Sequence, residues 1–134
     1  MKRIEEILLP EELRYSADHE WVGPEGELAR VGLTDYAQDQ LGDIVYVELP
    51  SVGAHIAQGA VFATVESVKS VSECYMPLSG EGVAVNGPLS DNPVLLNQSP
   101  YGDGWMVLVK PDDPAAVSQL LTAEAYRARL KGGV

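Results

Sequence analysis

The sequence predicts a mostly β protein, a small sandwich or barrel with short helices at its edges. Several short runs are rich in β-branched or aromatic residues, and turn residues such as Asn86-Gly87-Pro88 separate them. Helix signals are few and short. A chain of 134 residues with 46% hydrophobic content suits one folded domain. The predicted strands are Arg14–Val22, Leu28–Leu33, Ile44–Leu49, Val61–Glu66, Ser70–Met76, Gly82–Val85 and Trp105–Val109.

The first dozen residues are expected to lie outside this β unit. Ile4, Ile7 and Leu8 follow helical spacing, which predicts a short amphipathic helix that ends before Pro10. From Leu13 the pattern becomes that of strands. We expect no leader peptide, because acidic residues interrupt the N-terminal run at once. The predicted division is an N-terminal extension of residues 1–12, a single domain of residues 13–130 and a tail of residues 131–134.

Three further helices are predicted from their caps. Thr34 precedes an acidic first turn and Gly42 follows the last turn, which predicts a helix of about two turns between them. Asp113-Pro114 places an N-cap aspartate before a proline, and the helix runs on through Leu121. Thr122 is placed to cap a last helix.

One weak internal repeat is present. The pattern Val45-x-Val47-x-x-Pro50 recurs 38 residues later, beginning at Val83 and ending at Pro88. Each copy predicts a strand followed by a turn, so the two could be matching strands of a pseudo-two-fold core. Because V-x-V is common in β proteins, the repeat alone does not decide between symmetry and chance.

Charge narrows the choice of partners. Twenty acidic residues against nine basic ones give a formal net charge of −11. This balance argues against binding to nucleic acid, which needs a basic face, and against docking on anionic lipid. No apolar run approaches the ~18 residues of a membrane span. Proteins with basic patches, or small molecules, are the expected partners, although solubility alone could explain the charge.

The sequence offers little chemistry of its own. The single cysteine, Cys74, excludes an intrachain disulfide, and the acidic residues around it disfavour a thiolate. The two histidines, His19 and His55, belong to no nucleophile motif, and the usual metal-ligand spacings are absent. We therefore expect no metal site and no catalytic activity.

Lys69 is the residue that the sequence singles out. Val61, Ala63 and Val65 alternate along one strand, residues 67–70 break the alternation, and Val71 resumes it. This predicts a hairpin with Lys69 at its tip, presented on a flexible four-carbon stem to an enzyme that would acylate it. A solubilising lysine on a strand edge is the alternative, and spacing alone favours that alternative.

Five segments resemble the glycine cleavage system H-protein family, in order and over about residues 13–130. Residues 66–73, Glu-Ser-Val-Lys-Ser-Val-Ser-Glu, are similar to the lipoyl-attachment segment of that family. The other similar segments are Leu13–Val22, Val31–Pro50, Asn97–Met106 and Leu121–Tyr126.

The resemblance implies a lipoyl-domain fold, a flattened barrel or sandwich of two small sheets with pseudo-two-fold symmetry. It implies lipoic acid in amide linkage at Lys69, with Glu66 and Glu73 recognised by a lipoate-attaching enzyme. The implied function is carriage of an aminomethyl group from a pyridoxal-phosphate glycine decarboxylase to a folate-dependent aminomethyltransferase. A dihydrolipoyl dehydrogenase would then reoxidise the carrier. The dithiolane does the chemistry, so the protein itself is not an enzyme.

The resemblance also implies a cleft into which the loaded arm folds. Asp18, Glu20, Gln40 and Glu73 are the residues that match it, and their carboxylates would hold a cationic amine. The alternative is that Glu20 and Glu73 are solvated strand acids, while His19 and Trp21 are assigned to packing or turns. The chain departs from the family at position 73, where aspartate is usual, at position 18, and at Met76, where alanine is usual.

Other carriers fit less well. Biotin carriers place their lysine between two methionines, whereas Val68 and Ser70 flank Lys69 here. Two alternative functions stay open: a lipoate relay to other lipoyl enzymes, and an unmodified interaction module with this fold. The expected location is a bacterial cytoplasm, in preference to a mature mitochondrial form.

Overall fold

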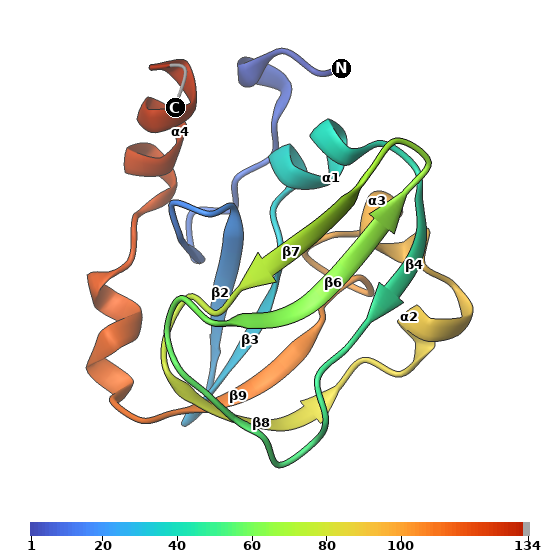
Figure 1. The fold of residues 1–134 in the computed structure, drawn as a ribbon. Helices are drawn as coiled ribbons and strands as arrows, with labels where there is room; N and C mark the ends of the chain where they lie inside the picture. The colour runs from blue at the N-terminus through green and yellow to red at the C-terminus, as the bar shows by residue number, and fades with distance from the viewer. Residues whose placement is uncertain (133–134) are drawn as a thin grey trace.

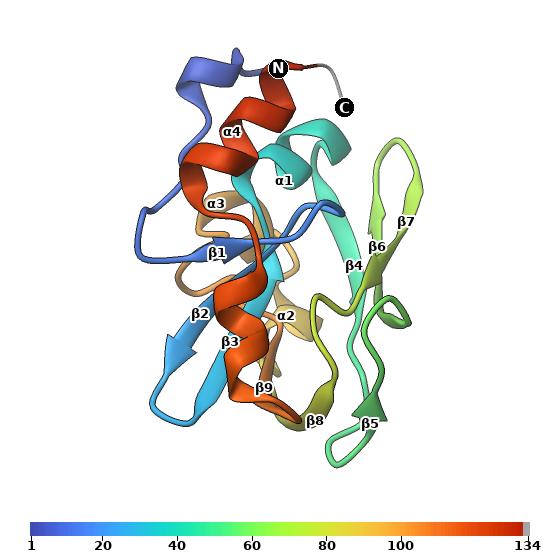
Figure 2. The same ribbon diagram turned by 90° about the vertical axis from the view of Figure 1, so that its left-hand side faces the viewer.

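Two antiparallel sheets pack face to face in the computed structural model, which describes residues 1–132. Figure 1 shows the smaller sheet in front of the larger one, and Figure 2 shows the two layers from the side. The prediction of a mostly β fold with two sheets and short helices is confirmed, and within residues 1–132 the sheets form no closed barrel. The larger sheet has the order β1 (Arg14–Tyr15), β2 (Glu20–Glu25), β3 (Leu28–Leu33), β9 (Val107–Pro111), β8 (Gly80–Val85) and β5 (His55–Ile56). The smaller has the order β4 (Ile44–Glu48), β6 (Val61–Ser67) and β7 (Val71–Tyr75).

The main hydrophobic core fills the space between the sheets. Alternation along the strands supplies it: on β3, Ala29, Val31 and Leu33 are buried in the core, while Leu28 and Arg30 on the other face are half-buried. The facing sheet contributes Val47, Val65 and Cys74, and the neighbouring strand β9 contributes Val107 and Val109. Burial of apolar area at about 25 cal/mol per Å² makes this layer the main source of stability.

A second apolar cluster fastens both ends of the chain to β2. Trp21 points away from the main core, and its indole nitrogen donates to Pro100 O at 2.9 Å. Tyr15 and Tyr126 stack beside it with ring centroids 5.0 Å apart. Ile7 and Leu9 from the N-terminal segment complete the cluster. Both faces of β2 are therefore buried.

Several caps are as predicted. Thr34 accepts from Ala37 N at the start of α1 (Asp35–Leu41), and Gly42 follows that helix with φ of 80°. Thr122 caps α4 (Ala123–Lys131) by accepting from Ala125 N. Among residues 1–132 the longest helix, α4, has nine residues, and no helix combines the length and hydropathy of a membrane span.

Other local predictions are wrong. The strand predicted over residues 14–22 is two strands, because His19 adopts a left-handed φ of 74° in the turn between them. The predicted N-terminal helix is a single 3₁₀ turn, η1 (Ile4–Glu6), and Leu8 is exposed. The helix after Asp113 is also 3₁₀, η2 (Pro114–Gln119), and ends before Leu121. Three elements were not predicted: β5, α2 (Pro88–Asp91) and α3 (Leu95–Gln98).

Two predictions remain untested in the fold. The repeated strands lie in different sheets, with Val45 and Val47 on β4 and Val83 and Val85 on β8. This placement is compatible with a pseudo-two-fold core, which stays a prediction. Of the predicted tail, Lys131 and Gly132 end α4, and residues 133–134 lie outside the described part of the chain.

Candidate functional site

Lys69 lies at the tip of the β6–β7 hairpin, as the broken alternation predicted. The Ser67 hydroxyl oxygen accepts from Lys69 N and from Ser70 N, at 3.1 Å each. Ser67 N donates to Ser70 O at 2.8 Å and closes the turn. Lys69 is exposed, whereas the strands behind it are tied to each other over their length. The ammonium group is therefore presented to solvent from a rigid base.

The loop between α1 and β4 supports this hairpin. Val68 N donates to Asp43 O at 3.0 Å. The aliphatic stem of Lys69 crosses Gly42, where an added Cβ would lie 3.1 Å from Lys69 Cε. Only glycine provides both this close approach and the positive φ without strain.

Asn97 on α3 fixes that loop. Its Nδ2 donates to Gly42 O at 2.9 Å, and its Oδ1 accepts from Ile44 N at 2.9 Å. Nδ2 also donates to Gln38 Oε1 at 2.9 Å. One side chain thereby holds both ends of the turn on which the Lys69 stem lies.

The hydrogen bonds continue from Gln38 to the N-terminus. Gln38 Nε2 donates to Asp35 Oδ1 at 2.8 Å, and Lys2 Nζ donates to both carboxylate oxygens of Asp35. Leu8 N donates to Asp35 Oδ2 at 2.9 Å. Burial raises the pKa of Asp35, but the hydrogen bonds from Lys2, Leu8 and Gln38 outweigh it and hold that pKa below its ordinary value. Asp35 is therefore a buried carboxylate that stays ionised.

A cleft of about 280 Å³ opens beside the hairpin, between α1, the turn before β2 and the edge strand β7. All four residues that the resemblance assigns to a docking cleft line it: Asp18, Glu20, Gln40 and Glu73. The rest of the lining is largely apolar or aromatic and consists of Leu33, Tyr36, Ala37, Leu41, His19 and Ser72. The structure thus brings together residues that lie up to 55 positions apart in the sequence.

Glu20 differs from the other three polar residues because it is buried, with 1% of its surface exposed. Its Oε1 accepts from Ser16 Oγ at 2.6 Å, and its Oε2 accepts from Tyr75 N at 3.2 Å. Burial raises the pKa of Glu20 from 4.5 to about 8, against the lowering effect of both hydrogen bonds. The interpretation of Glu20 as a solvated strand acid is wrong, whereas Glu73 is exposed.

His19 and Cys74 have structural surroundings. His19 Nδ1 bonds the Tyr126 hydroxyl at 2.7 Å, and burial lowers the pKa of His19, so the ring is a neutral part of the turn. Burial, and then the charge of Glu20, raise the pKa of the Cys74 thiol. The prediction that Cys74 is a structural, non-nucleophilic residue agrees with this burial.

Sequence reasoning missed three residues of the site. Gly42 was assigned no role beyond ending a helix, and Asn97 and Ser16 none beyond belonging to similar segments. The glycine in Leu41-Gly42-Asp43 was the one available signal, because a glycine after a helix marks a left-handed position.

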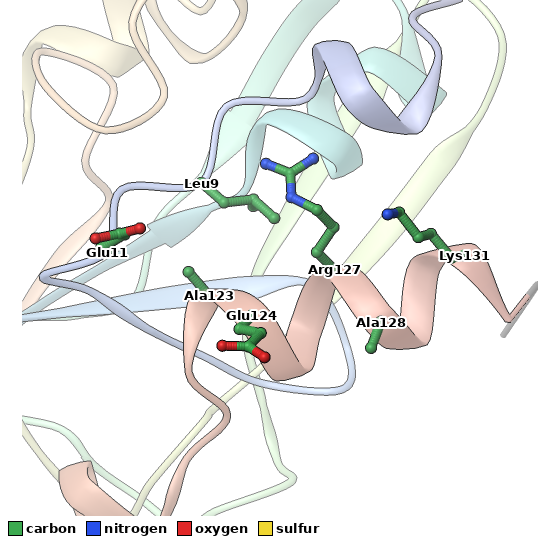
Figure 3. Close-up of a pocket in the computed structure, with 7 residues that line it drawn as sticks. All are labelled: Leu9, Glu11, Ala123, Glu124, Arg127, Ala128 and Lys131. Atoms are coloured by element: carbon green, nitrogen blue, oxygen red, sulfur yellow. The ribbon is translucent and has the colours of Figure 1, made fainter.

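A second hollow, shown in Figure 3, lies between α4 and the N-terminal segment and has a volume of about 390 Å³. Arg127 in its wall donates to Ile4 O and Ile7 O and thereby holds the segment in place. None of the predicted site residues lines it. Residues 1–132 contain no group of three or more His, Cys, Asp or Glu side chains placed to bind a metal ion.

Comparison with known proteins gives one consistent result. The sequence model of the family described as Glycine cleavage H-protein matches residues 13–133. A glycine cleavage system H protein from Geobacillus kaustophilus is 55% identical over 124 residues, which cover 92% of this chain and 98% of that protein. One from Bacillus subtilis is 53% identical over 118 residues, covering 88% and 93%.

A solved structure agrees with these sequence matches. The crystal structure of a glycine cleavage system H protein from Mycobacterium marinum superposes with a TM-score of 0.83 at 39% identity. The match covers 94% of this chain and 100% of that one. The fold, the hairpin and the sequence over residues 13–133 therefore lead to one conclusion: the chain belongs to the glycine cleavage H-protein family.

Proposed function

We propose that this carrier protein of a glycine cleavage system holds lipoic acid in amide linkage to Lys69 Nζ. The observation that carries the proposal is the exposed Lys69 on a braced hairpin, within the segment Glu66–Glu73 that resembles the family's attachment segment. When bound, the lipoyl group supplies the dithiolane that takes up an aminomethyl group and passes it on. We further propose that Glu66, half-buried on β6, and Glu73, exposed on β7, identify the hairpin to the lipoate-attaching enzyme.

The cleft fits the far end of such an arm. Its wall of Leu33, Ala37 and Leu41 suits an aliphatic chain, and the acids lie in the turn before β2, at the start of β2 and on the edge strand β7. Glu20 is largely protonated near neutral pH, because its pKa is about 8. A cationic amine placed beside it would favour the carboxylate form, so Glu20 would release its proton as the amine arrives. Asp18 and Gln40, both exposed, would complete the polar lining.

The proposed partners are those that the chemistry requires. They are a pyridoxal-phosphate glycine decarboxylase, a folate-dependent aminomethyltransferase, a dihydrolipoyl dehydrogenase and a lipoate-attaching enzyme. We assign the chain no catalytic acid, base or nucleophile, because Glu20 and His19 are held by structural hydrogen bonds and the Cys74 thiol is buried. The bacterial relatives support a bacterial cytoplasm as its place of work.

The attachment is tested by intact mass and fragment mapping after incubation with a lipoate ligase, lipoate and ATP. We expect one lipoyl increment on Lys69, and none in Lys69→Arg, which keeps the positive charge. An unmodified chain, under conditions that lipoylate a known lipoyl domain, would contradict the proposal and favour an interaction module.

The carrier role is tested separately, in a reconstituted glycine cleavage assay with the lipoylated chain. We expect glycine-dependent NADH formation that requires this protein. A lipoylated chain that supports no glycine cleavage but passes its lipoyl group to another apo-carrier would show a relay instead.

A further inference from the structure

The outer face of the three-stranded sheet carries an unusual concentration of exposed apolar side chains. Within residues 1–132 there are eight large exposed hydrophobic residues, and four of them surround the Lys69 hairpin. These are Val45, Tyr46, Val68 and Val71, with exposed fractions of 54%, 48%, 66% and 63%. Contiguous exposed apolar surface on a folded protein marks a contact with another molecule.

The strand register places Tyr46 and Val71 on one surface, and Val68 lies in the turn between β6 and β7. Tyr46 pairs with Glu66, and Glu66 pairs with Val71, so the three side chains form a row across the sheet. An irregularity in the register at Val45 turns that residue outward as well, next to the buried Ile44. We call Val45, Tyr46, Val68 and Val71 the hairpin face. Figure 1 shows this side of β4, β6 and β7 with no helix lying over it.

The charges around the hairpin face have one sign. In the next row Glu48 pairs with Thr64, and Thr64 pairs with Glu73, so acids border the apolar residues. Glu66 lies within the first row. Lys69 is the cation of the hairpin, and acylation would remove its charge. The complementary surface therefore has an apolar centre with basic residues around it.

The position of the face next to Lys69 selects among the proposed partners. An enzyme that acylates Nζ must bring its reaction centre within one lysine stem of the hairpin, so its own surface has to cover the neighbouring residues. Enzymes that act on the dithiolane meet the far end of the arm, so their position relative to the hairpin is less constrained. The attachment step joins Nζ to the carbonyl carbon of a lipoyl adenylate made from lipoate and ATP. The acyl–oxygen bond breaks, AMP leaves with the electron pair, and the amine loses a proton.

We propose that the hairpin face is the docking surface for the lipoate-attaching enzyme, with Tyr46 and Val71 as its anchors. This inference rests on the proposed attachment at Lys69. Aromatic residues at the centre of a contact carry a large share of binding energy, and rim charges mainly set its salt dependence. Tyr46 and Val71 are therefore expected to act on recognition, and Glu48 on the rate of encounter.

The test measures kcat/KM for lipoylation of the full chain by a lipoate ligase. Tyr46→Thr and Val71→Thr each place a polar, β-branched residue that suits a strand, and we expect each to lower kcat/KM about tenfold through KM. Val52→Thr is the matched control, because Val52 is 62% exposed in a turn outside the hairpin face, and its rate should equal that of the wild type. Glu48→Gln should weaken the dependence of the rate on salt. Circular dichroism melting shows that each variant is folded.

The outcomes separate the two proposals. A wild-type chain that is never lipoylated removes the attachment proposal itself. If the wild type is lipoylated and both anchor variants are lipoylated with the same kcat/KM, the docking proposal alone is overturned. A third outcome is also possible: the anchor variants are lipoylated as fast as the wild type but, once lipoylated, are less active in the reconstituted glycine cleavage assay. In that case the face binds another enzyme, and the proposal is equally overturned.

Discussion

The carboxyl group of Glu20 is buried and also lines the cleft beside the Lys69 hairpin. Two donors, Ser16 Oγ and Tyr75 N, reach its oxygens, yet burial still raises the pKa of Glu20 to about 8. Glu20 is therefore an acid in the lining of the cleft that stays protonated near neutral pH. Ionising Glu20 without a bound cation lowers the free energy of unfolding.

This cost predicts how stability depends on pH. Between 4.5 and about 8 the folded chain keeps a proton on Glu20 that the unfolded chain has lost, so the raised pKa makes stability fall as pH rises. Glu20→Gln removes this titration, and its amide can donate to Ser16 while accepting from Tyr75 N. From about pH 5 to about pH 9 we expect the wild type to lose roughly 1 to 3 kcal/mol relative to this variant. Denaturant unfolding at several pH values measures it.

Glu73→Gln serves as the control, because Glu73 is an exposed acid of the same cleft. Its stability should run parallel to that of the wild type over the same pH range. Parallel curves for Glu20→Gln and the wild type would mean that Glu20 is ionised in the fold throughout, and the proton release proposed for it would be withdrawn.

Single residues show where sequence reasoning reached its limit. The hairpin and the exposure of Lys69 followed from alternation alone, since both depend on neighbours in the chain. The burial of Glu20 did not follow, because four consecutive residues of β2 are buried and period-two alternation fails there. Val22 joins the main core and Trp21 joins the second apolar cluster, so both faces of β2 are covered, and neither contact leaves a local pattern.

At the scale of elements, α3 has a clear task although it is only four residues long. It positions Asn97, which holds the α1–β4 loop at Gly42 and Ile44, and that loop supports the Lys69 hairpin through Asp43 O. The segment of residues 86–99 was not predicted as helix because glycine, proline and asparagine recur in it. Tertiary contacts, and not helix propensity, form these turns.

Asn97→Ala tests this support. The substitution leaves Gly42 O, Ile44 N and Gln38 Oε1 without their partner, and we expect a loss of about 2 to 4 kcal/mol in the free energy of unfolding. Amide hydrogen exchange at Val68 should also become faster relative to Val109, since the acceptor of Val68 N lies in the loosened loop.

Asn92→Ala is the matched control, an exposed asparagine of the same connection, and should change stability by less than about 0.5 kcal/mol. If Asn97→Ala lowers stability while the exchange at Val68 stays unchanged, Asn97 stabilises the fold without bracing the hairpin.

At the scale of the whole molecule, the two-sheet architecture was predictable, but the packing of the N-terminal segment was not. The sequence separates residues 1–12 from the domain, and the family match begins at residue 13. In the structure this segment buries Ile7 and Leu9, and Arg127 of α4 holds its backbone. Figure 2 shows it running beside α4. The contact from Lys2 to Asp35 spans 33 positions, so no local pattern signals it.

One tie between this segment and the domain is the ion pair of Lys2 with Asp35, at 2.8 Å, in which the Asp35 side chain is 3% exposed. Lys2→Ala leaves a buried carboxylate with fewer donors. Because Lys2 is itself 38% exposed and Leu8 N and Gln38 still donate, we expect a loss of about 1 to 2 kcal/mol near pH 7. The pKa of Asp35 is lowered in the fold, so this stabilisation exists above its ordinary value of 3.8 and disappears as pH falls through the lower, folded value. The difference between Lys2→Ala and the wild type should therefore vanish in acid.

Arg3→Ala is the control, because the Arg3–Glu6 pair is exposed and its loss should change stability by less than about 0.5 kcal/mol. Denaturant unfolding across pH measures all three chains, and a Lys2→Ala deficit that persists at the lowest pH would show that Lys2 acts through packing and not through the charge of Asp35.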